Sequence, residues 1–92
     1  MRKITRDAVQ AFYAGTNYRN TNTEVKNGVY MLHGNIIAVR YDNGDIEISL
    51  AGWNTNTTRE RLNGLEGVEV RTKQGQAYLN GEPWDGTRTK IN

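Results

Sequence analysis

Two short segments of this 92-residue chain repeat one polar pattern beside an aromatic residue and an arginine. Residues 18–24 read YRNTNTE, and residues 53–59 read WNTNTTR. The second segment leads into a predicted helix, where free backbone amides, threonine hydroxyls and an arginine would suit a small anion. Aromatic rings like those in both segments stack on nucleic-acid bases. We therefore predict a site for a nucleotide or a phosphodiester, formed by Tyr18, Arg19, Asn22, Trp53, Asn54, Thr55, Thr57, Thr58, Arg59 and Arg61.

A structural interpretation of the same residues stays open. Thr57 would cap its own helix, and the asparagine side chains would hydrogen-bond the backbone of both loops. The chain contains 11 Asn, 10 Gly and 10 Thr, about a third of its residues. Most of the glycines and about half of the asparagines fall at predicted turns and helix ends. The remaining Asn and Thr concentrate at residues 20–23 and 54–58, inside the two repeated segments.

Groups suited to catalysis are few. His33 is the only imidazole, and as a general base it would need a carboxylate to orient it. The chain has no cysteine, and therefore no thiolate nucleophile and no disulfide. The acidic residues show no acid–base or metal spacing; residues 42–45, DNGD, lack the later ligands of a calcium loop and are predicted to form a turn. We therefore predict a protein that is not an enzyme and holds no metal or cofactor.

The charge of the chain is close to balanced, with 12 basic and 10 acidic residues and a net charge of +2. A dedicated nucleic-acid binder usually carries a denser basic stripe. Eight of the basic residues are arginine, whose planar fork suits phosphate or carboxylate, and ordinary surface charge is the alternative explanation. No apolar run approaches the length of a membrane span, and the N-terminus lacks a signal-peptide pattern. We therefore expect a cytoplasmic protein that does not bind a membrane.

Helical spacing of apolar residues predicts a helix over residues 6–14, capped by Thr5 and ended by Gly15. Residues 16–22 are predicted to form a loop. A second helix of about two turns is predicted at residues 58–63, where Thr57 and Glu60 have capping-box spacing. Five dipeptides between the remaining segments predict hairpin turns: Asn27-Gly28, Gly34-Asn35, Asn43-Gly44, Gln74-Gly75 and Asn80-Gly81.

Alternating apolar and polar residues predict the strands. Ile37, Val39 and Tyr41 share one face in this pattern, and residues 46–50 alternate in the same way. The expected fold is a single α+β domain over residues 1–92. It has an antiparallel meander of about five strands, an N-terminal helix, and a short helix between the third and fourth strands. The polar end of the chain is expected to fray after Trp84, which either clamps the tail onto the sheet or anchors a partner.

Five blocks are distributed along most of the chain, at residues 8–12, 22–25, 32–38, 52–63 and 78–86. These blocks resemble a family of small accessory proteins from tailed bacteriophages. The resemblance implies expression in a bacterial cytoplasm and a role that virion assembly does not require. It carries over no catalytic residue.

Three functions follow as expectations. The first is a binding protein that counters host defence, by sequestering a cyclic nucleotide signal or by inhibiting a host defence protein. The second is a module that binds single-stranded DNA or RNA, with Arg40 and Arg71 on the polar strand faces and stacking supplied by Tyr30, Tyr41, Tyr78 and Trp53. Glu47 and Glu69 on the same faces oppose it. The third is a minor virion component. Because a small sheet exposes two edges, we also expect a homo-oligomer, a dimer or higher.

Overall fold

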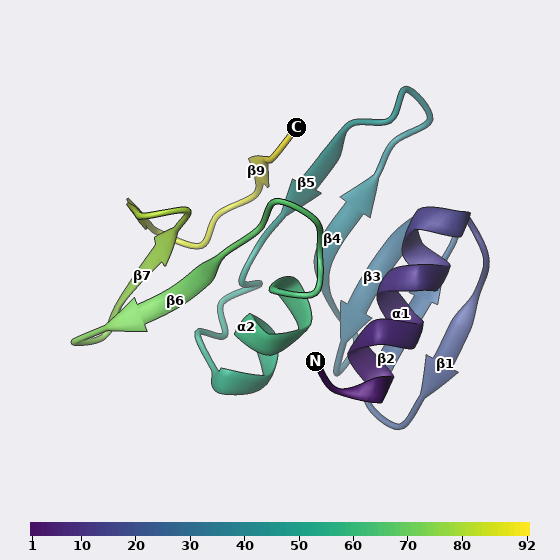
Figure 1. Ribbon diagram of the computed structural model, residues 1–92, viewed down its shortest axis with the longest axis horizontal. Helices are drawn as coiled ribbons and strands as arrows, with labels where there is room; N and C mark the ends of the chain where they lie inside the picture. The colour runs from purple at the N-terminus through teal and green to yellow at the C-terminus, as the bar shows by residue number, and fades with distance from the viewer.

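The computed structural model describes residues 1–92 as two helices and nine strands (Figure 1). The elements in chain order are α1 (Lys3–Ala14), β1 (Tyr18–Asn20), β2 (Thr23–Lys26), β3 (Val29–Leu32), β4 (Asn35–Arg40), β5 (Ile46–Ile48), α2 (Asn56–Leu62), β6 (Val70–Lys73), β7 (Gln76–Leu79), β8 (Glu82–Trp84) and β9 (Thr89–Lys90). The predicted α+β class, with an N-terminal helix and a short helix between strands, is confirmed. The strands exceed the expected five and divide into two sheets.

The larger sheet has the order β1-β2-β3-β4-β5-β9, and every neighbouring pair in it is antiparallel. The predicted turn at Asn27-Gly28 is confirmed, because φ of both residues is positive, at +53° and +78°. The next turn lies one residue earlier than predicted, on His33-Gly34, with φ of +52° and +77°. Residues 16–22 are not all loop, since β1 pairs there with β2. A polar strand of three residues carries no apolar alternation by which to detect it.

A bulge in the pairing of β3 with β4 changes which side chains face the core. The register shifts between Tyr30 and Met31, and as a result Ile37 and Ala38 are both buried. The prediction that Val39 and Tyr41 share the buried face of Ile37 is therefore wrong. Tyr41 is exposed, and its hydroxyl donates to Glu47 Oε1 at 2.7 Å.

Both helices cover one face of the larger sheet. Helix α1 contacts β1, β2 and β3 (Figure 1). It places Phe12 against Tyr30, with 5.8 Å between the ring centroids. It begins at Lys3, earlier than predicted, and Arg2 precedes it without a side-chain cap. Thr5 does not cap the helix, because it lies inside α1 and is fully buried. Gly15 ends the helix in the left-handed region, as predicted.

The smaller sheet has the order β6-β7-β8, and one of its faces completes the core. Val70, Ala77 and Trp84 are buried on that face, whereas Arg71 and Tyr78 form a cross-strand pair on the other. The indole N–H of Trp84 donates to Thr87 O and Thr89 Oγ1, so Trp84 clamps the tail. The predicted fraying is wrong, because β9 pairs with β5 and extends the larger sheet.

Candidate functional site

A cavity of about 400 Å³ lies where the β3–β4 turn, the segment after β5 and the start of α2 meet. We call it the Trp53 cavity. Leu32, Ile37 and Leu50 give it an apolar floor. Its remaining lining residues are His33, Asn35, Trp53, Thr55, Thr57 and Thr58.

A tight turn explains why the indole ring of Trp53 is exposed to solvent at this cavity. Ala51 and Gly52 both have positive φ, and Trp53 N donates to Leu50 O at 2.9 Å to close the turn. Leu50 faces the core, whereas the Trp53 side chain is 59% exposed. Trp53 is the most exposed aromatic residue of the chain and borders the apolar floor of the cavity, which makes it the strongest candidate for contact with a ligand.

The start of α2 supplies the polar rim. Thr55 is the N-cap: its Oγ1 accepts from Thr58 N at 3.1 Å and lies 3.0 Å from Thr58 Oγ1. The prediction that Thr57 caps this helix is therefore wrong, since the helix begins two residues earlier than the capping-box spacing indicates. Thr57, His33 and Asn35 make no side-chain hydrogen bond within the chain, and all three line the cavity.

Arg59 and Arg61 do not line the Trp53 cavity. Arg59 donates to Asn54 O at 3.1 Å and to the side-chain oxygens of Asn54 and Asn56, and it lines a neighbouring hollow instead. Arg61 is 1% exposed, and its side chain is fully buried inside the protein. The anion site predicted for these two guanidinium groups is therefore not assembled around the cavity.

The guanidinium of Arg61 joins both helices to the larger sheet. It donates to Thr23 Oγ1 at 3.0 Å, to Thr5 Oγ1 at 3.1 Å and to Glu60 Oε1 at 2.5 Å. A longer contact of 3.5 Å reaches Asn22 Oδ1. Burial alone would raise the pKa of Glu60, but the hydrogen bonds from Thr5 and Arg61 outweigh it and hold the pKa below its ordinary value.

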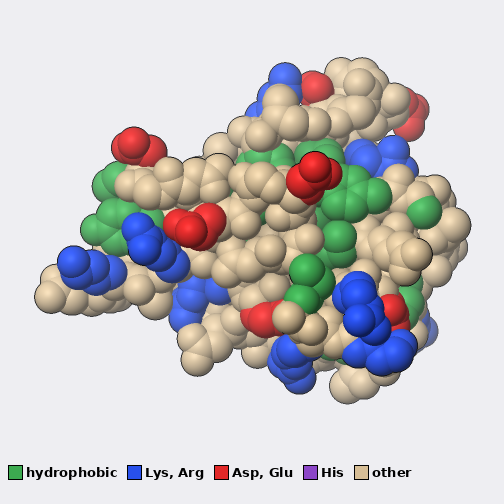
Figure 2. Space-filling view, viewed as in Figure 1, with side chains coloured by type: hydrophobic (Ala, Val, Ile, Leu, Met, Phe, Trp, Pro, Cys, Tyr) green, Lys and Arg blue, Asp and Glu red, His purple; other side chains and the backbone are tan.

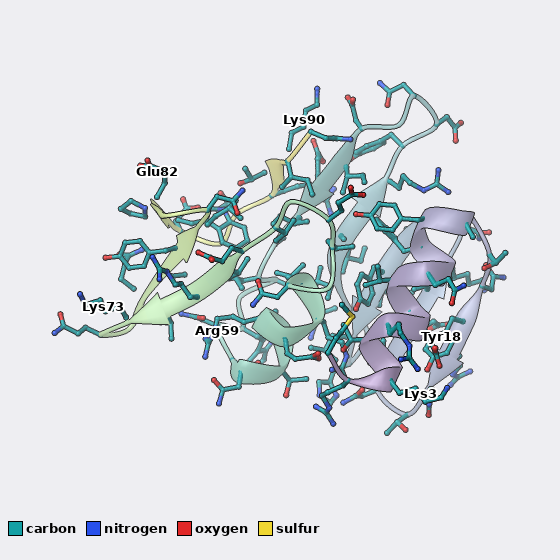
Figure 3. The ribbon with its side chains drawn as sticks, viewed as in Figure 1. Lys3, Tyr18, Arg59, Lys73, Glu82 and Lys90 are labelled. Carbon is teal, nitrogen blue, oxygen red and sulfur yellow. The ribbon has the colours of Figure 1, made fainter.

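The two repeated segments do not form one site. Tyr18 and Arg19 lie on β1 at the edge of the larger sheet, where Tyr18 packs partly against the core and Arg19 is exposed. Figure 3 shows Tyr18 beside α1 and Arg59 on α2. The side chain of Asn22 contacts Arg61, which lies on α2 two residues beyond the second segment.

Four of the ten predicted site residues line the Trp53 cavity: Trp53, Thr55, Thr57 and Thr58. Sequence reasoning missed the floor of the cavity, as well as Asn35, and considered His33 only for catalysis. The Leu50–Trp53 turn and the β3–β4 turn meet only in the folded chain, so spacing along the sequence gave no signal for this. No group of three or more His, Cys, Asp or Glu residues is placed to hold a metal ion. Neither helix has the length and apolar character that crossing a bilayer requires.

A family described as Kyanoviridae Gp96 protein matches residues 1–90 of the chain. No curated protein and no solved structure matches it.

Proposed function

The chain belongs to the Kyanoviridae Gp96 family, a family of phage proteins, and we propose that it works as a binding protein without catalysis. Its ligand in this proposal is a nucleobase-bearing signal of bacterial defence, such as a cyclic nucleotide, which the protein sequesters. The observation that carries the proposal is the exposed indole of Trp53 at the rim of a cavity of about 400 Å³. Cavities that bind small molecules generally begin at about 300 Å³.

The lining of the Trp53 cavity favours a planar, largely apolar group. Leu32, Ile37 and Leu50 offer apolar contact, and Trp53 offers a stacking surface worth roughly 1–3 kcal/mol per base. The unpartnered side chains of His33 and Thr57 are placed to hydrogen-bond the polar edge of a base.

The charge at the cavity determines how such a ligand would enter. No Lys or Arg lines the cavity, so nothing there repays the cost of burying a phosphate. The base would therefore enter first, and the phosphate would stay at the mouth in contact with water. This differs from the predicted mode, in which arginine held the anion.

The same proposal makes the protein an accessory factor that acts in the cytoplasm of the infected bacterium, where nucleotide signals are made. The resemblance of its sequence blocks to accessory phage proteins supports this. Mass spectrometry of purified particles tests it: the protein should be abundant in infected cells and missing from virions, and its recovery from virions would contradict an accessory role.

Isothermal titration calorimetry of the full chain against a panel of cyclic mono-, di- and trinucleotides tests the binding proposal. At least one should bind, Trp53→Ala should abolish binding, and Trp53→Phe should retain part of it. Tyr41→Ala is the matched control, because Tyr41 is also exposed and does not line the cavity.

Two results would refute the nucleotide proposal. One is the absence of heat with every nucleotide at high micromolar protein. The other is a Trp53→Ala variant that binds as tightly as the unchanged protein. A host protein captured by the unchanged chain and not by Trp53→Ala would assign the same residue to a protein inhibitor instead.

A further inference from the structure

Two shallow hollows adjoin each other on the far side of α2 from the Trp53 cavity. One, of about 590 Å³, is lined by Arg59, Glu60, Arg71 and Thr72 among others. The other, of about 390 Å³, is lined by Arg71, Thr72, Lys73, Tyr78 and Gly81. They share Arg71 and Thr72 and so adjoin each other along β6, between α2 and the β6–β7 hairpin; we call the two together the basic groove.

Positive charge dominates the basic groove. Its three cations are Arg59, Arg71 and Lys73, and its only acidic lining residue is Glu60, which already binds Arg61. The contacts of Arg59 are to neutral asparagine oxygens and leave its charge uncompensated.

Acidic groups near the basic groove reduce this charge only slightly. Glu69 lies 3.7 Å from Arg71, but both side chains are about two-thirds exposed, and such a pair is weak. Figure 3 places Lys73 and Arg59 along the β6 edge of the smaller sheet and Glu82 at the opposite edge. Figure 2 shows Lys and Arg side chains at the end of this hairpin and below it.

The register of β6 and β7 places the aromatic ring of Tyr78 beside these cations. Arg71 is the cross-strand partner of Tyr78, and Val70 and Ala77 on the same two strands face the core. Alternation therefore directs Arg71, Lys73 and Tyr78 to the outer face. Of the other residues predicted for nucleic acid, Tyr30 is buried and Arg40 donates to Phe12 O, so neither is available.

We infer that the basic groove binds single-stranded nucleic acid, with phosphates on Arg59, Arg71 and Lys73 and a base stacked on Tyr78. Cations that follow a backbone beside an aromatic ring are the combination used by sequence-tolerant single-strand binders. An acidic peptide would use the cations but leave Tyr78 without a partner. This site is separate from the Trp53 cavity and does not depend on the proposed nucleotide ligand.

Fluorescence anisotropy with a labelled 20-nucleotide oligothymidine at several salt concentrations tests the inference. Three phosphate contacts predict a slope of log K against log salt of about −2, which weakens binding about 20-fold between 50 and 200 mM. The double variant Arg71→Gln with Lys73→Gln should make the slope shallower, at about −0.7, because one phosphate contact remains. The matched control is Lys3→Gln with Lys90→Gln, which removes two exposed cations outside the groove and should leave the slope unchanged.

Substitutions of Tyr78 distinguish the contribution of stacking to binding from the contribution of charge. Tyr78→Phe should bind like the unchanged protein, Tyr78→Leu should bind several-fold more weakly at the same salt slope, and Trp53→Ala should have no effect. Circular dichroism of each variant confirms that it is folded. The inference is overturned by absence of binding at 50 mM salt, by equal slopes for the groove and control variants, or by equal competition from a polyglutamate peptide of the same length.

Discussion

Replacing Arg61 with alanine is the most severe single perturbation that the structure predicts. Its guanidinium is buried between α1, α2 and β2, where it neutralises Glu60 and donates to the hydroxyls of Thr5 and Thr23. Alanine would remove all these donors at once. It would also leave Glu60 without its cation and a void in the position of one of the largest fully buried side chains.

The expected loss is about 3 kcal/mol of unfolding free energy. Breaking a buried ion pair from one side typically costs 3–5 kcal/mol, and the 28% exposure of Glu60 places this case at the low end, because water can reach the carboxylate. At roughly 4–8 °C per kcal/mol for a domain of this size, the melting temperature should fall by about 12–24 °C.

Urea unfolding followed by circular dichroism measures this loss. Arg71→Ala is the matched control, since Arg71 is exposed and should cost less than about 0.5 kcal/mol. Adding Glu60→Gln to Arg61→Ala should recover part of the loss, because the uncompensated charge is then gone. A loss below about 1 kcal/mol for Arg61→Ala, or no recovery in the double variant, would refute the reasoning that Arg61 stabilises the core through charge and hydrogen bonds.

Four further measurements check other parts of the fold. Thr55→Ala should cost about 1 kcal/mol in urea unfolding as a lost N-cap, whereas Thr57→Ala should cost nearly nothing; the reverse order would contradict the observed helix start. Gly28→Ala should lower the melting temperature more than Gly75→Ala, because both have positive φ but only at Gly28 would a Cβ lie 2.8 Å from a backbone oxygen of β4. Since the pKa of Glu60 is lower in the folded chain, its stabilising effect should be complete at neutral pH and be lost as the pH falls below about 4.5, and Glu60→Gln should flatten that part of an acid-unfolding curve. Sedimentation velocity checks the self-association predicted from the free edge of β1, and a monomer at every concentration would contradict it.

The turns were predictable from the sequence because they depend on local backbone preference. Asn27-Gly28, Gln74-Gly75 and Asn80-Gly81 all adopt the paired positive φ values that a two-residue hairpin requires. The order of β3, β4 and β5 follows directly, since short turns force neighbouring strands to pair. Sequence alone could not place β9, because a polar strand of two residues is defined only by its partner across the sheet.

The bulge in β4 shows a second limit on predicting the fold from the sequence. Period-two alternation assigns faces correctly only while the register holds, and one additional residue reverses every later assignment. Ile37 and Ala38 are therefore both buried, and Arg40 on the helix side reaches Phe12 O at 3.0 Å. Nothing local to residues 35–40 indicates this shift, because it appears only in the pairing of β4 with β3.

The excess of arginine over lysine has a different meaning in the fold than in the composition. A planar fork suits phosphate, but it equally suits fixed acceptors inside a protein, and a buried lysine could not reach several of them at once. Arg61 and Arg40 bind hydroxyl, carboxylate and carbonyl oxygens of this chain, and Arg59 holds the Asn54–Asn56 segment. The composition therefore predicted correctly that arginine forks bind oxygen acceptors, but the acceptors of these three residues belong to the chain itself and not to a ligand. Arg71 and Lys73 make no side-chain hydrogen bond within the chain, and the one ion pair of Arg71, with Glu69, is exposed. Both lie on β6 beside Tyr78, so the surface suited to a polyanion lies on the smaller sheet and not on the repeated polar segments.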